Sequence, residues 1–242
     1  ISHKNVLWTI ESLFGQMIPA SKFPRIVSYL PMAHIAARAG DHYQAIYRIG
    51  QIFPVPVLED MRDALPTIKP SVFLAVPRVW EKFKAGLEAR IEENPKKDLI
   101  AKAIKNGLER VDYEQKGETV PFMVGLKDKV FSKLVFSKFK EGLGIVDTEY
   151  FVTAAAPMNK DVHRWFHAIG IDVTEIYGMT EDTGPATIGV PGNAVESFSK
   201  RLKADSIEVP SVLNPIGKVG IPIPGTEVKV MEDGELCIKG NH

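Results

Sequence analysis

Short β-like runs alternate with helical stretches along much of the chain, and this alternation constrains the fold more than any other feature. The β-like runs cover 25–30, 51–57, 71–76, 145–153 and 171–176, and predicted helices at 33–49, 59–65 and 159–169 lie between neighbouring runs. Strands that alternate with helices are typical of a parallel sheet. We therefore predict an α/β fold with a parallel sheet flanked by helices.

Two regions depart from this alternation. Predicted helices from Pro77 onward, at about 98–115 and at about 126–141, suggest a helical insertion over about 81–141. From Gly184 the sequence becomes rich in Gly, Pro and Val, and 227–239 predicts an antiparallel β-hairpin with a primed turn at Asp233-Gly234. We expect an α/β part over 1–183 and a β-rich, antiparallel part over 184–242.

Composition argues against several classes of protein. The 242 residues carry 30 basic and 30 acidic side chains, so no net charge attracts nucleic acid or an anionic membrane. No apolar run reaches the length of about 18 residues that a spanning helix needs. The single cysteine, Cys237, cannot form an internal disulfide. We expect a globular, cytoplasmic protein, and the first residue, Ile1, suggests a piece of a longer one.

The segment 177–181 directly follows a predicted buried strand and carries Tyr, Gly, Met, Thr and Glu. Ligands of open α/β sheets bind at the carboxyl ends of strands. An aromatic ring, a glycine, a hydroxyl and a carboxylate suit a nucleotide with its Mg²⁺. An ordinary strand-to-loop turn is the alternative, because such short windows arise by chance. The small-residue loop 153–158 also follows a predicted strand, however, and two such loops would form a shelf for a flat ring.

A series of motifs follows one another in order along most of the chain: 1–5, 29–35, 76–82, the Ala-rich loop 153–158, 177–181, 217–225 and 234–240. Together they resemble the adenylate-forming acyl-CoA synthetases, in particular the long-chain fatty acyl-CoA ligases. The resemblance implies a two-step reaction. A fatty carboxylate attacks the α-phosphate of ATP to give acyl-AMP and pyrophosphate, and the sulfur of coenzyme A then displaces AMP.

The resemblance also implies roles for particular residues. Thr180 would hydrogen-bond the phosphate, and Glu181 would hold Mg²⁺; both are candidate catalytic residues. Relatives place a residue near the substrate carboxylate and the acyl tunnel at the position of His34, which is the third candidate. A nucleotide site would be formed by Tyr177, which would stack on adenine, by Gly178, Met179 and Thr180, and by Ala155, Ala156 and Pro157, which would line the adenine pocket.

The chain also departs from the family pattern. Relatives usually carry Gly at one or both of the positions held by Ala154 and Ala155. The family's phosphate loop, ribose-binding Asp, hinge and catalytic C-terminal Lys are absent from this sequence. We therefore expect the chain to be a fragment of a ligase's large N-terminal region, with 1–183 as its acyl- and adenylate-binding part. We expect the isolated chain to be inactive, because the Lys that neutralises transition-state charge is missing.

Two features have a second interpretation. His34 either borders the substrate carboxylate or is a partly buried core histidine. The region 126–141 has five lysines against Asp128 and Glu141, together with several apolar residues. Such a helix either lies on a membrane surface, which would make the protein a peripheral membrane partner, or packs its apolar stripe on the body with the charges solvated. Charge runs are usually solvated, which favours the second interpretation.

Two other functions fit parts of the sequence. One is an adenylating ligase for another carboxylic acid, because the depth of an acyl tunnel cannot be derived from the sequence. The other is a non-catalytic interaction module that docks through the basic helix. Thr180 and Glu181 argue against the module, because a scaffold does not need a phosphate-binding hydroxyl beside a metal-binding carboxylate.

Overall fold

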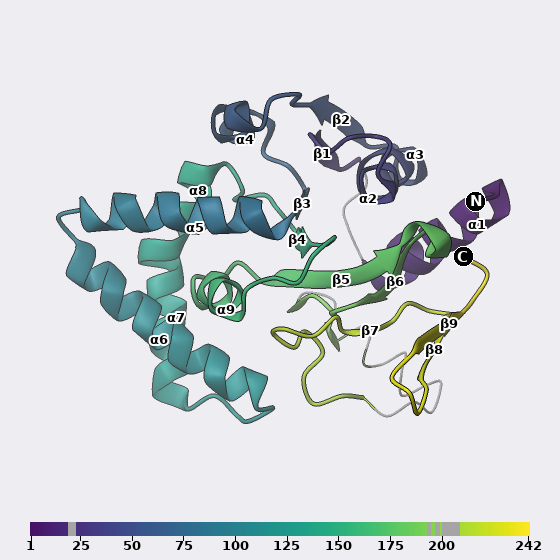
Figure 1. The fold of residues 1–242 in the computed structure, drawn as a ribbon. Helices are drawn as coiled ribbons and strands as arrows, with labels where there is room; N and C mark the ends of the chain where they lie inside the picture. The colour runs from purple at the N-terminus through teal and green to yellow at the C-terminus, as the bar shows by residue number, and fades with distance from the viewer. Residues whose placement is uncertain (19–22, 193–194, 197–198, 200–208) are drawn as a thin grey trace.

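The computed structural model describes residues 1–18, 23–192, 195–196, 199 and 209–242. One sheet has the strand order β2-β1-β3-β4-β5-β6-β7, and its first five strands are parallel (Figure 1). The parallel strands are β1 (Arg25–Ser28), β2 (Gln51–Pro54), β3 (Val72–Ala75), β4 (Tyr150–Thr153) and β5 (Val173–Met179). The predicted α/β fold with a parallel sheet is confirmed.

Helices connect the parallel strands where the sequence predicted them. Between β1 and β2 lie α2 (Ile35–Ala37), the π-helical η2 (Arg38–Tyr43) and α3 (Gln44–Arg48). Between β2 and β3 lie the short 3-10 helix η3 (Leu58–Asp60) and α4 (Met61–Ile68), and α9 (Lys160–Ala168) joins β4 to β5. At the N-terminal end, Ser2 caps α1 (His3–Ile10), which continues into the π-helical η1 (Glu11–Met17).

The connection from β3 to β4 contains α5 (Pro77–Glu92), α6 (Lys97–Gln115), α7 (Phe122–Phe131), the π-helical η4 (Ser132–Phe136) and α8 (Ser137–Leu143). In Figure 1 these helices gather on one side of the molecule. Trp80, near the start of α5, is fully buried and lies at the centre of an aromatic cluster with Phe73 of β3, Phe151 of β4 and Phe166 of α9. The first turns of α5 therefore belong to the core under the sheet.

The sheet changes direction after β5. The strands β6 (Gly184–Ile188) and β7 (Ile221–Pro222) pair antiparallel and extend the sheet beyond β5. A separate hairpin pairs β8 (Glu227–Val230) with β9 (Leu236–Lys239). The antiparallel C-terminal segment is thus confirmed. The division of the chain at residue 183 stays a prediction, and β6 continues the sheet that contains β5.

The turn of the β8–β9 hairpin differs from the prediction. A two-residue primed turn of type I′ needs positive φ at both central residues. Here only Gly234 has positive φ, at 89°, whereas Asp233 does not. The amide of Gly234 donates to the carbonyl oxygen of Met231 at 3.0 Å, and the loop closes with a bond from the amide of Met231 to the oxygen of Glu235. The strands are therefore shorter than expected, and the turn is longer.

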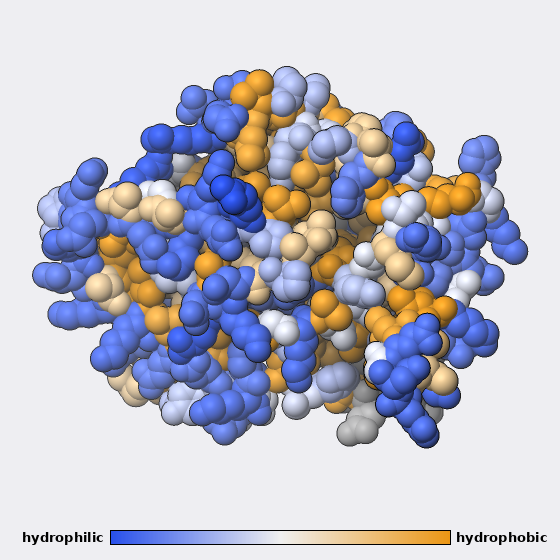
Figure 2. Space-filling model, viewed as in Figure 1, coloured by the Kyte–Doolittle hydropathy of each residue, from blue (hydrophilic) through white to orange (hydrophobic). Residues whose placement is uncertain are grey.

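Hydrophobic residues lie at several places on the face drawn in Figure 2. Hydrophilic residues cover most of the side formed by α5 and α6, and hydrophobic residues collect toward the middle of this face. Among the helices that the structure describes, none is both long enough and apolar enough to cross a membrane.

A buried histidine joins α9 to β5. His163 is fully buried, and its Nε2 lies 2.7 Å from the carbonyl oxygen of Val173. Its Nδ1 lies 3.9 Å from Oε2 of Glu175. Burial lowers the pKa of His163 to about 4, and the charge of nearby His167 acts in the same direction. The ring is therefore neutral at pH 7 and donates its Nε2–H to Val173.

The shifted pKa of His163 predicts how stability depends on pH. Between its ordinary pKa of 6.5 and its folded pKa of about 4, the unfolded chain binds a proton that the folded chain does not. This residue's contribution to the free energy of unfolding is therefore complete above pH 6.5 and falls by about 3 kcal/mol as the pH approaches 4. Urea midpoints of the intact protein, measured from pH 7.5 downward, should fall less steeply in His163→Gln than in wild type. Parallel curves would contradict the assignment.

Candidate functional site

The predicted nucleotide loops lie at neighbouring strand ends. Thr153, the last residue of β4, pairs with Glu175 of β5, and both strands run in the same direction. The Ala-rich loop after β4 and the segment 177–181 at the end of β5 therefore emerge at one edge of the sheet. This is the edge at which ligands of α/β sheets bind.

A buried carboxylate anchors the Ala-rich loop to β5. Oε1 of Glu175 accepts a hydrogen bond of 3.1 Å from the amide of Met158, and both residues are buried. Burial raises the pKa of Glu175. Met158 packs into the core beneath, whereas Ala155, Ala156 and Pro157 are exposed. The loop is held at its end and is open to solvent between the two strands.

Ala155 has a backbone conformation that favours glycine. Its φ is 74°, in the left-handed region. This conformation costs a residue with a Cβ roughly 1–2 kcal/mol. Local strain of this kind is concentrated at functional sites. Ala155 therefore has a backbone conformation that a glycine, expected at this position from the family resemblance, would adopt without this cost.

The segment from Tyr177 to Glu181 presents its side chains to solvent. Tyr177 is 37% exposed and Met179 42% exposed, and Thr180 and Glu181 are also exposed. Gly178 lies at a register shift between β5 and β6, and a Cβ on it would lie only 1.7 Å from the carbonyl oxygen of Gly184. The glycine is therefore required by the neighbouring strand, whatever ligand binds beside it.

An acidic residue that the sequence analysis did not single out lies next to Glu181. Asp182 is buried, its Oδ2 has no hydrogen-bond partner within the described ranges, and burial raises its pKa. Thr183 follows with a left-handed φ of 59°. The described residues contain no group of three or more His, Cys, Asp or Glu side chains that could hold a metal ion. A Mg²⁺ held by the single exposed carboxylate of Glu181 and by substrate phosphates would need no such group.

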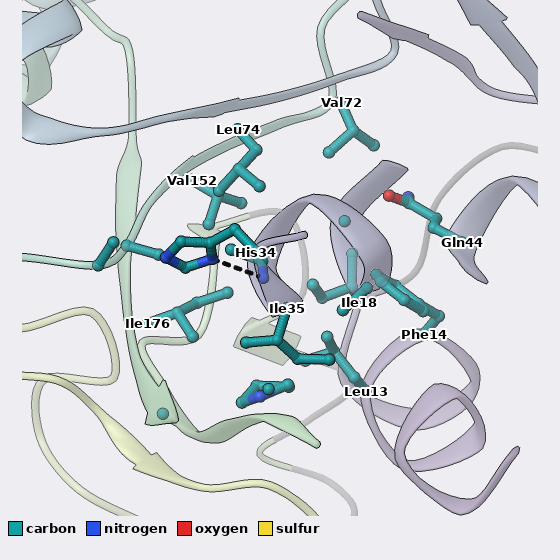
Figure 3. A pocket seen from close by; sticks show the side chains of 18 residues that line it. Leu13, Phe14, Ile18, His34, Ile35, Gln44, Val72, Leu74, Val152 and Ile176 are labelled. Carbon is teal, nitrogen blue, oxygen red and sulfur yellow. Dashed lines mark hydrogen bonds between the residues drawn. The ribbon is translucent and has the colours of Figure 1, made fainter. Parts of the chain in front are cut away.

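A cavity of about 80 Å³ opens beside these loops (Figure 3). Its walls are mainly apolar and come from η1, from the helices after β1, and from β3 and β4; they include Leu13, Phe14, Ile35, Val72 and Val152. His34, Ala155 and Gly178 also line it and are exposed, so the cavity opens at the strand ends. The structure thus brings His34 together with Ala155 and Gly178. Thr180, the candidate for binding phosphate, is not among the lining residues, so the structure does not place it in one cavity with His34.

His34 is not a core histidine. Its side chain is exposed, and its Nδ1 accepts a hydrogen bond of 3.1 Å from the amide of Ala36, which makes it the N-cap of α2. In Figure 3 the ring lies near Leu74, Val152 and Ile176. Since Nδ1 is the acceptor in the cap, the neutral ring carries its proton on Nε2. The alternative of a buried core residue is therefore wrong, and His34 remains a candidate for contact with a carboxylate.

Among the residues that the structure describes, Gln44 is the one other polar side chain that lines the cavity. It is 1% exposed, and neither its Oε1 nor its Nε2 has a hydrogen-bond partner in the part of the chain that the structure describes. Buried side-chain amides nearly always have hydrogen-bond partners, so the unpaired amide of Gln44 at the closed end of the cavity is unusual. No local pattern in the sequence singles out Gln44, because its burial depends on segments from elsewhere in the chain that pack around it.

A model of the AMP-binding enzyme family matches residues 1–242. The chain belongs to this family. The matched family agrees with the geometry described above, in which the loops 154–157 and 177–181 meet at the carboxyl edge of a parallel sheet.

The relatives are fatty-acid–CoA ligases. A protein of Mycobacterium tuberculosis, provisionally named fatty-acid–CoA ligase fadD11, is 33% identical over 247 residues, which cover 99% of this chain and 39% of that protein. The long-chain-fatty-acid–CoA ligase ACSBG2 of Rattus norvegicus is 33% identical over 202 residues, 78% of this chain and 29% of the relative. The chain therefore spans well under half the length of these relatives.

Solved structures show the same fold. The N-terminal domain of FACL13 from Mycobacterium tuberculosis superposes with a TM-score of 0.58 at 17% identity and covers 100% of this chain, which corresponds to 46% of that structure. A benzoate CoA ligase from Burkholderia xenovorans superposes with a TM-score of 0.59 at 15% identity, over 99% of this chain and 37% of that structure. The sheet and its helices are thus the family fold.

The unpaired amide of Gln44 predicts that an apolar replacement stabilises the fold. Gln44→Leu keeps a similar volume and removes a buried donor and acceptor that have no partners, so the free energy of unfolding of the intact protein should rise by about 1–3 kcal/mol. Thermal melts would measure the change. Gln51→Leu makes the same replacement at an exposed position of β2 and should change stability little. A lower melting temperature for Gln44→Leu would contradict the expectation.

Proposed function

We propose that the protein carrying this chain is an ATP-dependent long-chain fatty acid–CoA ligase, which forms acyl-AMP and then transfers the acyl group to coenzyme A. The observation that carries the proposal is the cavity itself. Its apolar walls suit the carbon chain of a fatty acid, and its open end joins His34 to the Ala-rich loop and Gly178. The names of the relatives support the substrate class.

Each candidate residue has a role that its position allows. The exposed ring of Tyr177 offers a face for adenine, and Ala155, Ala156 and Pro157 leave room for it because they are small or flat. The Thr180 hydroxyl, free in solvent, would donate to a phosphate oxygen. Mg²⁺ bound at Glu181 would offset phosphate charge. The Nε2–H of His34 would hold the fatty carboxylate at the cavity mouth, where the α-phosphate arrives.

The proposal assigns acyl and adenylate binding to residues 1–183, and it assigns the complete reaction to a longer protein. The chain covers 39% of its Mycobacterium tuberculosis relative, and the C-terminal Lys implied by the family resemblance lies outside it. We therefore propose that the 242 residues alone form no acyl-CoA. The single exposed cysteine, Cys237, supports a reducing, cytoplasmic location.

A change at Glu181 tests the nucleotide half of the site. In the intact protein, Glu181→Ala should lower fatty-acid-dependent pyrophosphate release by about 10²-fold or more, because a Mg²⁺ ligand is lost. The melting temperature should stay unchanged, since the side chain is exposed. Scanning the assay over acids of increasing length would identify the substrate.

A matched control separates this effect from a general loss of surface charge. Glu235→Ala removes an exposed carboxylate from the turn of the β8–β9 hairpin and should leave pyrophosphate release at the wild-type rate. If Glu181→Ala were as active as Glu235→Ala, another carboxylate would hold the metal and the assignment would fail.

A pair of variants tests His34. His34→Ala removes both the imidazole and the N-cap of α2, whereas His34→Asn removes the imidazole and keeps a cap acceptor. Both should slow adenylation while ATP binding stays near wild type, because His34 contacts the acid and not the nucleotide. Only His34→Ala should also lose stability, by about 1 kcal/mol.

Rates of pyrophosphate release, ATP affinity and thermal melts distinguish the two losses. Wild-type kinetics in His34→Asn, whatever its stability, would show that His34 serves only as a helix cap.

A further inference from the structure

The helix formed by α7 and η4 has two apolar faces, and only one of them packs on the body. Val124, Val135 and Phe136 are buried. On the opposite side, Phe122 is 79% exposed, Leu126 45%, Val130 47% and Leu134 62%. The spacing of four residues places these side chains in one stripe along the helix. Met123, which is 57% exposed, lies beside the stripe.

Lysines border this stripe. Lys127, Lys129, Lys133 and Lys138 are exposed, and none of the four forms an ion pair within the described ranges. At roughly 100° per residue, Lys129 and Lys133 fall on one side of the stripe and Lys127 on the other. The fifth lysine, Lys140, is partly buried, and burial lowers its pKa. The four exposed ammonium groups are therefore available to an anionic partner.

The helix that carries the stripe has little negative charge of its own. Asp128 is the only acidic residue between 122 and 140, and its Oδ1 lies 3.1 Å from Nε of Arg110 on α6. Its carboxylate thus faces the neighbouring helix and is neutralised there. The exposed face combines apolar side chains with unopposed positive charge.

We propose that the exposed face of α7 and η4, defined by Phe122, Leu126, Val130 and Leu134 with their bordering lysines, docks on an anionic lipid bilayer. A helix with an apolar face flanked by lysines lies in the plane of a membrane interface, with its apolar residues among the acyl chains and its ammonium groups at the phosphates. A second copy of the chain is a poorer occupant, because a symmetric contact would bring four lysines against four.

The packing of this helix differs in part from the expectation drawn from its sequence. We expected the apolar side of this helix to pack on the body. Val135 and Phe136 do so, but the stripe from Phe122 to Leu134 stays outside the core. No described helix is suited to cross a membrane, so the contact would be peripheral. The proposal rests on exposure and charge and does not depend on the proposed reaction.

Flotation of the intact protein with vesicles tests the docking surface. Vesicles of phosphatidylcholine with phosphatidylglycerol should carry the protein upward, vesicles of phosphatidylcholine alone should carry far less, and high salt should release it. Leu126→Gln with Leu134→Gln should lower the partition coefficient by at least tenfold, because two exposed apolar side chains no longer enter the bilayer. Lys129→Gln with Lys133→Gln should also lower it by about tenfold or more.

Control variants carry the same changes at other surfaces. Ile46→Gln replaces a residue that is 68% exposed on α3, and Lys102→Gln with Lys105→Gln removes two exposed lysines from α6. Both should bind vesicles as wild type does, and thermal melts should show all variants folded.

The proposal is overturned if wild type does not float with anionic vesicles, or if the α7 and η4 variants float as well as the controls. A dimer in solution that the double Leu variant dissociates would also overturn it. Pyrophosphate release, measured without vesicles, should be unaffected by these variants, so the docking surface and the proposed reaction can fail separately.

Discussion

The parallel pairing of β3 with β4 and of β4 with β5 sets the position of the candidate nucleotide-binding residues. The register Ala75 with Thr153 and Thr153 with Glu175 aligns the three carboxyl ends. Backbone hydrogen bonds fix this alignment, and the buried aromatic cluster around Trp80 holds the strands against α5 and α9. Because β3 and β4 are buried along nearly their whole length, a shift of one residue would exchange the side chains that face the Trp80 cluster with those on the opposite face, so the core and the site depend on the same register.

The site combines a rigid base with an open rim. The buried Glu175 accepts from Met158 and so joins β5 to the end of the Ala-rich loop, while His163 connects α9 to the same strand. Above these contacts, Tyr177, Thr180 and Glu181 are exposed. The side chains proposed to contact a nucleotide are thus exposed, whereas the strand and loop that carry them are held by buried hydrogen bonds.

Polar groups within the cavity are few and differ in environment. His34 lies at the open end with one nitrogen engaged in a helix cap, and Gln44 lies at the closed end with both amide atoms unpaired. The walls between them are mainly apolar. A ligand with a charged head and an apolar tail matches this order, because the charge stays near solvent and the tail replaces water at apolar walls.

The sequence by itself determined the order of strands and helices and gave reasons to examine the segments 154–157 and 177–181 as site candidates. These follow from local patterns of spacing and residue type, which act over a few residues. Only the tertiary structure decided that His34 is exposed beside Ala155, that Gln44 is buried without a partner, and that one apolar stripe of α7 and η4 remains uncovered. These depend on which segments distant in sequence pack together. Likewise, the hairpin turn could not be predicted from Asp233-Gly234 alone, because the pairing of Met231 with Glu235 lengthened the loop.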